Sequence, residues 1–406
     1  MRSRKILCLF DYNATTGFAT VSQNIISLLK KHFGDNLSLD IVAINYFGES
    51  YTQKDGTRVY PGILPVNGEV DEFGRHRFLQ FLANGNYDGI FIIQDIGIIT
   101  PIIPMLREIK KRKSPKNGFK SIFYFPIDGV PLKKWFDDID FFDVIITYTK
   151  YATNEILKIR PDLNGKLIDI IHGINLKDFY PMAPFARFEF RKFYFGSNAG
   201  KFIINAGNRN QPRKDFPTLM LGFKLFKSLC PDSLLYLHCN PRDHMGHDLY
   251  LIAEQLGLVE GEDFMFPPKD YFDAGAAINV LNSIINSCDV YLTTTSGEGF
   301  GFWPAQAAAC KIPVIAPFNT SLIEMSGHGK HFLCLMISRP YINHFDSMVR
   351  TQCEPSEVAA LLWRVKDKHD ENQDRIQKAY KYIQSLSWET VIKEWIDVFD
   401  KTFFKK

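Results

Sequence analysis

The segment DVYLTTTSGEGFGFWPAQAAACKIPVIAP, residues 289–317, contains a complete strand–helix–strand pattern. The apolar run at 289–295 predicts a buried strand, a glycine-rich loop follows, and Pro304 suits the first turn of a helix. The run PVIAP at 313–317 predicts a second strand. Two strands joined through a helix indicate a parallel pair, so the glycine-rich loop should lie at the carboxyl edge of a sheet.

The same alternation extends along the chain. In the first half it predicts strands at 5–10, 38–47, 89–95, 121–128, 143–149 and 166–173, and helices at 20–32, 102–112 and 150–159. In the second half it predicts further strands at 201–208 and 234–239, and helices at 217–229, 249–256, 277–287 and 304–310. Continuous apolar strands separated by helices are typical of parallel sheets covered on both faces. We therefore expect an α/β protein with two successive doubly wound units.

The composition also favours a globular protein of two domains. The chain has 406 residues, is 46% hydrophobic and 23% charged, and carries a formal net charge of +3, which gives no reason to expect bulk nucleic-acid binding. Its seven cysteines are scattered without metal-ligand spacing, so we expect reduced thiols in a cytoplasmic protein. No apolar run has the length of a signal peptide core or a membrane-spanning helix.

The loop at 296–302 is suited to binding a polar ligand through its backbone. Glycines at 297, 299 and 301 allow close approach of backbone amides, and the start of the following helix favours negative charge. A polyol or a nucleotide phosphate fits this chemistry. Glu298 could accept hydrogen bonds from sugar hydroxyls, although it could also simply cap the helix.

A second loop at the same predicted edge carries cations. The strand at 201–208 runs into Asn208-Arg209-Asn210-Gln211-Pro212-Arg213-Lys214-Asp215. Two fixed cations there could neutralise a diphosphate, arginine as a fork and lysine as a point charge. The alternative is that these are solvated loop charges.

Three segments carry a family resemblance. EGFGFWPAQAAACKIPV (298–314) resembles the EGFGLPxLEAMACGxPV signature of retaining GT-B-fold glycosyltransferases of family four, the glycogen-synthase-like group. GNRNQPRKDFPTLMLGF (207–223) is similar to the diphosphate loop of that family, and IIHGINLKDFYP (170–181) resembles its HGVDxxxFxP segment. The resemblance covers nearly the whole chain and is best in the second half.

The resemblance implies a domain organisation. In a GT-B enzyme two Rossmann-like domains face a central cleft. Residues 1–181 would form the N-terminal acceptor-binding domain, 182–200 a linker, and 201–383 the C-terminal nucleotide-sugar-binding domain. Residues 384–406 would form a C-terminal helix that crosses back to the N-terminal domain.

The resemblance also implies roles for residues of the second half. Arg209 and Lys214 would bind the diphosphate of a UDP- or GDP-sugar and stabilise it as it leaves. Glu298 and the amides around Gly299, Phe300 and Gly301 would hold the donor sugar.

Three positions depart from the family pattern. Gln306 replaces a second glutamate that would bind the ribose, and its amide keeps one acceptor but loses the charge. Gly17 is one of a usual pair of glycines near the donor phosphate and acceptor. Asp128 falls in a region where relatives carry a histidine, so we take it as the candidate for orienting the acceptor hydroxyl, the alternative being a turn residue before Gly129.

The resemblance implies transfer of a sugar to an acceptor hydroxyl with retention of configuration. Such a reaction needs charge stabilisation and alignment more than a protein nucleophile. No DxD pair suits a metal at the diphosphate, so we expect a metal-independent enzyme without a cofactor. The acceptor, whether glycan, lipid or nucleic acid, stays open.

The segment REIKKRKSPKNGFK, residues 107–120, is strongly basic. It could contact an anionic membrane surface peripherally, or another polyanion, and the alternative is a solvated helix end.

Other classes of protein remain to be weighed. A GT-B-fold epimerase or hydrolase would need catalytic carboxylates and histidines in both halves, and a non-catalytic nucleotide-sugar-binding protein is favoured only by Gln306. An NAD-dependent enzyme is disfavoured because DYNATTG follows the first strand and no GxGxxG is present there.

Overall fold

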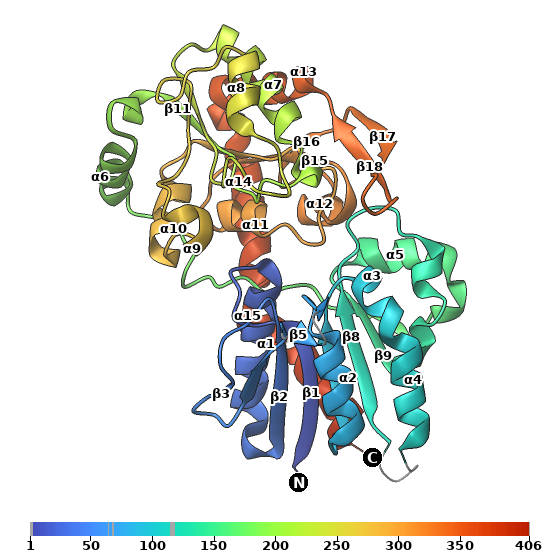
Figure 1. Cartoon of the computed structure of the whole chain (residues 1–406). Helices are drawn as coiled ribbons and strands as arrows, with labels where there is room; N and C mark the ends of the chain where they lie inside the picture. Colours follow the sequence, from blue (N-terminus) through green and yellow to red (C-terminus); the bar gives the residue numbers. More distant parts are fainter. Residues whose placement is uncertain (1–2, 64, 67–68, 114–117, 406) are drawn as a thin grey trace. The chain divides into compact units, whose positions relative to one another are not determined.

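The computed structural model describes residues 3–63, 65–66, 69–113 and 118–405, which divide into two compact units (Figure 1). The first unit comprises Met1–Ile127, Pro131–Gly173 and Trp388–Lys406. The second comprises Asp128–Val130 and Ile174–Ser387. Asp128–Val130 therefore belongs to the second unit, although the chain on both sides of it belongs to the first.

The first unit contains an eight-stranded sheet in the order β10-β9-β8-β7-β1-β2-β4-β3. All neighbouring strands are parallel except the edge pair β3 and β4. The strands are β1 (Arg4–Asp11), β2 (Leu37–Ile44), β3 (Tyr51–Thr52), β4 (Arg58–Pro61), β7 (Gly89–Ile93), β8 (Lys120–Phe125), β9 (Val144–Thr147) and β10 (Leu167–Asp169). A separate short hairpin is formed by β5 (Pro65–Val66) and β6 (Glu69–Val70).

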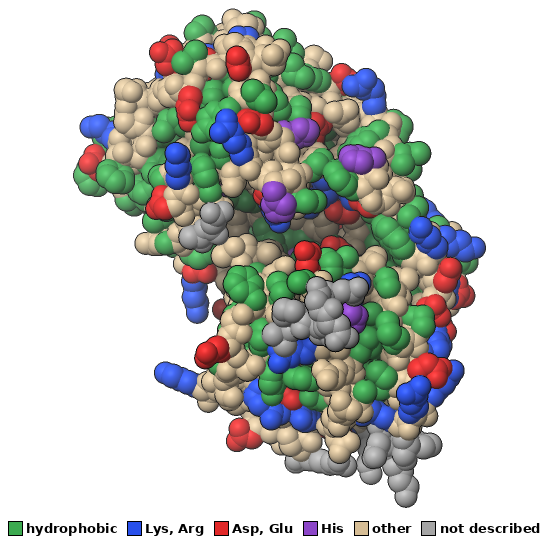
Figure 2. Space-filling model, in the orientation of Figure 1, with side chains coloured by type: hydrophobic (Ala, Val, Ile, Leu, Met, Phe, Trp, Pro, Cys, Tyr) green, Lys and Arg blue, Asp and Glu red, His purple; other side chains and the backbone are tan. Residues whose placement is uncertain are grey.

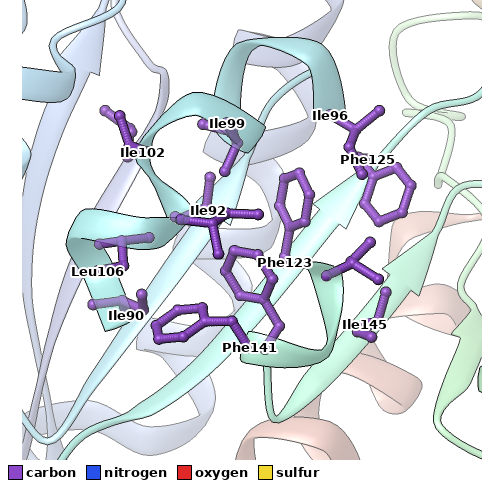
Figure 3. Close-up of a cluster of buried hydrophobic side chains, with 14 of the residues drawn as sticks. Ile90, Ile92, Ile96, Ile99, Ile102, Leu106, Phe123, Phe125, Phe141 and Ile145 are labelled. Atoms are coloured by element: carbon purple, nitrogen blue, oxygen red, sulfur yellow. The ribbon is translucent and has the colours of Figure 1, made fainter. Parts of the chain in front are cut away.

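Helices cover this sheet because its central strands are apolar on both faces. They are α1 (Gly17–Phe33), α2 (Arg75–Asn84), α3 (Ile96–Ile99), α4 (Ile103–Arg112), α5 (Lys150–Ile159) and α15 (Trp388–Phe399). Figure 3 shows part of the resulting core, in which side chains from β7 and β8 meet those of α3, α4 and the short 3-10 turn between the two helices (Thr100–Ile102): Ile90, Ile92, Phe123, Phe125, Ile96, Ile99, Leu106 and Ile102. On α15, Trp395 contacts Phe91 and Tyr124, with ring centroids 5.4 and 4.7 Å apart.

The second unit contains a six-stranded parallel sheet in the order β13-β12-β11-β14-β15-β16. Its strands are β11 (Phe202–Asn205), β12 (Ser233–Tyr236), β13 (Phe264–Met265), β14 (Val290–Leu292), β15 (Val314–Pro317) and β16 (Leu333–Leu335). Its helices are α7 (Phe216–Leu229), α8 (Leu249–Gln255), α9 (Tyr271–Ala274), α10 (Ile278–Asn286), α11 (Phe302–Ala309), α12 (Thr320–Met325), α13 (Pro355–Asp367) and α14 (His369–Ser385). The predicted α/β class with two doubly wound parallel sheets is confirmed.

Two parts of the second unit contain secondary structure that the apolar periodicity did not predict. Residues 182–200, for which the sequence predicted a linker, contain helix α6 (Pro184–Phe195), whose Arg191 forms an ion pair with Asp289, Nη1 to Oδ1 2.9 Å. An unexpected antiparallel hairpin is formed by β17 (Ser338–Ile342) and β18 (Val349–Cys353). All seven cysteines are free thiols and six of them are buried.

Candidate active site

The cationic loop and the glycine-rich loop meet at the carboxyl edge of the second sheet. One follows β11 and the other follows the neighbouring strand β14. The amide of Ser296 donates to the carbonyl of Arg213 at 2.8 Å, and the hydroxyl of Thr294 donates to the carbonyl of Asp215 at 2.8 Å. The cationic loop and the glycine-rich loop therefore form one surface.

Lys214 and Glu298 form an ion pair at the centre of this surface. Lys214 Nζ donates to Glu298 Oε1, and the two residues are only 8% and 7% exposed. Asp215 has a φ of 51°, a left-handed conformation that aspartate tolerates. It turns the chain from Lys214 into α7 and caps that helix. The amide of Glu298 donates to Thr320 Oγ1 at 2.9 Å, and this hydrogen bond holds the backbone of Glu298 in place.

The pair is charged at neutral pH. Burial lowers the pKa of Lys214 to about 8, with Arg213 adding to this effect and Glu298 opposing it. Burial also disfavours ionisation of Glu298, but Lys214 and Arg213 outweigh it and hold the pKa of that carboxyl below its usual value. The first turn of α11 has no side-chain cap, so the carboxylate of Glu298 serves Lys214 and does not cap the helix.

Arg213 connects this pair to Asp128. Its Nη1 donates to the carbonyl of Gly297 at 2.7 Å and lies 3.4 Å from Glu298 Oε2, and its Nε lies 3.2 Å from Asp128 Oδ2. The other oxygen of Asp128 accepts a hydrogen bond of 2.9 Å from Arg350. Burial alone would raise the pKa of Asp128, but Arg213 and Arg350 lower it below its ordinary value. The lowered pKa keeps the carboxylate ionised at neutral pH. The side chain of Asp128 is 24% exposed.

Arg209 lies apart from this cluster. Its Nε forms an ion pair of 2.8 Å with Asp243 Oδ2, and its side chain is 51% exposed. The structure thus brings Arg213 and Lys214 together, whereas the family pattern assigned the diphosphate to Arg209 and Lys214.

The glycine-rich loop approaches its neighbours closely. A Cβ on Gly297 would overlap the carbonyl oxygen of Asp128 and lie 2.8 Å from Arg350 Nη1. Gly301 has a φ of 98°, a left-handed conformation that suits glycine, and begins α11. Within the described part of the chain, the amides of Gly299 and Gly301 donate to no protein acceptor, so they are available to a ligand at the start of this helix.

Aromatic side chains lie beside this loop. Trp303 stacks on Tyr291 with centroids 6.2 Å apart and planes 8° apart, and it contacts His238 at 5.2 Å. Gln306, on the next turn of α11, is half-buried. No sequence pattern marks Trp303 or His238 as a site residue, because large aromatic side chains are ordinarily buried in the core.

The remaining predicted residue, Gly17, belongs to the first unit. It is exposed and begins α1, whose cap is Thr16 with its hydroxyl accepting from the amide of Ala19 at 3.1 Å. Thr16 in turn donates to Asp11 Oδ2 at 2.6 Å, at the end of β1. Gly17 therefore lies just beyond the carboxyl end of β1 in the first sheet.

In the described part of the basic segment 107–120, several cationic side chains form ion pairs with acidic residues. Lys110 Nζ lies 3.0 Å from Asp143 Oδ2, and Arg107 Nη2 lies 3.1 Å from Asp138 Oδ1. Residues 114–117 lie outside the described residues. On the face shown in Figure 2, lysine and arginine side chains are interspersed with aspartate and glutamate.

The described residues contain no cluster of three or more His, Cys, Asp or Glu side chains able to hold a metal ion. Among the same residues, no helix combines the length and apolar character needed to cross a bilayer.

The sequence is similar to one curated protein. No family model matches the sequence. A probable sucrose-phosphate synthase of Thermosipho melanesiensis is 22% identical over 252 residues, which are 62% of this chain and 51% of that protein. The chain thus matches about half the length of this relative.

Solved structures show the fold. HepE of Anabaena, in complex with UDP-glucose, has a TM-score of 0.70 at 14% identity, over 98% of this chain and 100% of that chain. Sucrose-phosphate synthase of Thermosynechococcus elongatus has a TM-score of 0.71 at 15% identity, over 99% of both chains. WaaG, a glycosyltransferase involved in lipopolysaccharide biosynthesis, has a TM-score of 0.67 at 12% identity, over 97% of this chain and 99% of that chain. These neighbours confirm the predicted GT-B fold and the resemblance to glycosyltransferases of that fold.

Proposed function

We propose that this protein is a retaining, metal-independent glycosyltransferase that moves a sugar from a nucleotide-diphosphate donor to an acceptor hydroxyl. The observation that carries the proposal is the buried Lys214–Glu298 pair, joined to Arg213 beside a glycine-rich helix start at the carboxyl edge of a parallel sheet. A diphosphate needs fixed cations and free amides, and a sugar needs a carboxylate acceptor; this surface offers all three.

In this proposal the donor lies on the second unit, which corresponds to the nucleotide-sugar-binding domain at 201–383. Lys214 binds the diphosphate and stabilises its charge as the sugar leaves. Arg209 joins it by exchanging Asp243 for a phosphate oxygen. Glu298 and the amides of Gly299, Phe300 and Gly301 hold the sugar.

The remaining residues act on the acceptor and the nucleoside. Asp128 accepts a hydrogen bond from the acceptor hydroxyl, and Gln306 takes the ribose. The domain at 1–181 binds the acceptor, and Gly17 belongs to the loop that the family resemblance assigns to donor phosphate and acceptor. UDP-glucose is the first donor to test, because HepE, a neighbour in fold, binds it.

The test is to incubate the protein with UDP-, GDP- and ADP-sugars and to measure free nucleotide, with and without EDTA. Slow donor hydrolysis that EDTA leaves unchanged is expected. The anomeric configuration of the product, read by NMR, tests retention. Binding without turnover under every acceptor would favour a nucleotide-sugar-binding protein, and an epimerised sugar would favour an epimerase; either result would reject the proposal.

Gln306→Glu is expected to change nucleotide affinity. A carboxylate accepts two ribose hydroxyls with a full charge, whereas the amide offers one acceptor, so the variant should bind the nucleoside diphosphate up to about tenfold more tightly. Isothermal titration with UDP and GDP measures this change. An unchanged dissociation constant would mean that Gln306 does not touch the ribose.

A further inference from the structure

The β17–β18 hairpin contacts the candidate site at several points. Tyr341 donates from its hydroxyl to Ser296 Oγ at 3.0 Å, at the base of the glycine-rich loop. The amide of Val130 donates to the carbonyl of Val349 at 3.0 Å, which joins the segment carrying Asp128 to the hairpin. Asn319 Nδ2 donates to Thr351 Oγ1 at 3.1 Å. The hairpin therefore supports the site loops from one side.

Arg350, on β18, makes the most specific of these contacts. It is 4% exposed, and its two terminal nitrogens reach different atoms of Asp128: Nη1 donates to the backbone carbonyl, and Nη2 to Oδ1 at 2.9 Å. Nη2 also donates to Asp346 Oδ2 at 2.8 Å, which holds the guanidinium in place from within the hairpin. A planar fork that grips both backbone and carboxylate leaves Asp128 little freedom of rotation.

We propose that Arg350 is a positioning residue, which holds the carboxylate of Asp128 against Arg213 in the orientation that receives the acceptor hydroxyl. This inference rests on the proposed function, because it gives the orientation of Asp128 its purpose. Arg350 itself touches neither donor nor acceptor. In this proposal the acceptor hydroxyl approaches the Asp128 side chain, which is 24% exposed.

The charges around Asp128 give the proposal a pH signature. Arg213, Lys214 and Glu298 face it from the two site loops, and Arg350 and Asp346 face it from the hairpin. Burial raises the pKa of Asp128, and the arginines lower it. When Arg350 is removed, only Arg213 and Lys214 remain to counter the effect of burial. The pKa of Asp128 should therefore rise, and the acidic limb of the pH profile should move to higher pH.

The experiment compares Arg350→Gln, Arg350→Lys and the control Arg339→Gln on the same hairpin. Arg339 is a matched control because it is an exposed arginine paired with Glu354, Nε to Oε1 2.9 Å. Arg350→Gln should lower kcat about 10²-fold with little change in the donor KM. Its acidic limb should move up by about one pH unit. Arg350→Lys keeps the positive charge but loses the planar guanidinium, so it should restore the acidic limb of the pH profile and only part of kcat. Arg339→Gln should match the wild type. If Arg350→Gln keeps the wild-type limb, or loses no more kcat than Arg339→Gln, the proposal is overturned.

A second readout separates this proposal from the proposed function. If the wild type turns over no nucleotide sugar, the proposed function fails, and the titration of Asp128 still tests Arg350. The carboxyl ¹³C signal of Asp128 can be identified by its loss in Asp128→Asn protein labelled at aspartate. We expect it to titrate at higher pH in Arg350→Gln than in the wild type. Equal titration in the two proteins would overturn the role of Arg350 independently of activity.

Discussion

Replacing Lys214 with alanine is expected to reduce turnover of the nucleotide sugar about 10²–10³-fold. The ammonium is proposed to meet charge that develops on the leaving diphosphate, so its removal should act mainly on kcat. The same change leaves Glu298 buried with only Arg213 beside it, at 3.4 Å. Measuring kcat and KM by nucleotide release, with circular dichroism to establish folding, checks the expectation.

The matched control for this variant is Lys224→Ala. Lys224 is an exposed lysine on α7, the helix that follows Lys214. It should keep wild-type kinetics, and Arg209→Ala should lose turnover as Lys214→Ala does. Because burial lowers the pKa of Lys214 to about 8, wild-type turnover should also fall as the pH rises through that value and the ammonium loses its proton. Near-normal rates in both Lys214→Ala and Arg209→Ala would refute the diphosphate assignment.

Gly297→Ala is expected to reduce turnover by at least about 10²-fold, for a steric reason. A Cβ at this position would overlap the carbonyl oxygen of Asp128, a backbone atom that cannot rotate away. The loop carrying Glu298 and the segment carrying Asp128 would have to separate, which displaces both proposed site carboxylates. Steady-state kinetics and the melting temperature together measure the effect.

Gly200→Ala is the control for this substitution. Gly200 also belongs to the second unit, but a Cβ there would meet no heavy atom within 4 Å. It should leave both activity and melting temperature unchanged. Wild-type kinetics in Gly297→Ala would show that the close approach of the two segments is not needed for the reaction.

Much of the fold could be predicted from apolar periodicity. The predicted strand at 5–10 lies within β1 (Arg4–Asp11), and the predicted helix at 150–159 coincides with α5, because continuous burial leaves a strong pattern in the sequence. The β17–β18 hairpin was missed, since every residue of β17 is exposed and no apolar alternation marks it.

The sequence could predict which loops form the candidate site, but not which side chains form ion pairs within it. Adjacent parallel strands end at one edge, which is why the loops of Lys214 and Glu298 could be expected to meet. Which arginine joins them depends on side-chain direction, and Arg213 rather than Arg209 reaches Glu298. Arg350 lies 222 residues from Asp128 in the sequence, and no local pattern connects them.

The return of α15 to the first unit has a consequence for how the protein is made. Trp395 fills the core between Phe91 and Tyr124, yet it follows the entire second unit in the sequence. During synthesis the first unit therefore cannot complete its core until the whole of the second unit has been made. A truncated chain that ends at Ser387 should carry an unfinished, protease-sensitive first unit beside a resistant second unit.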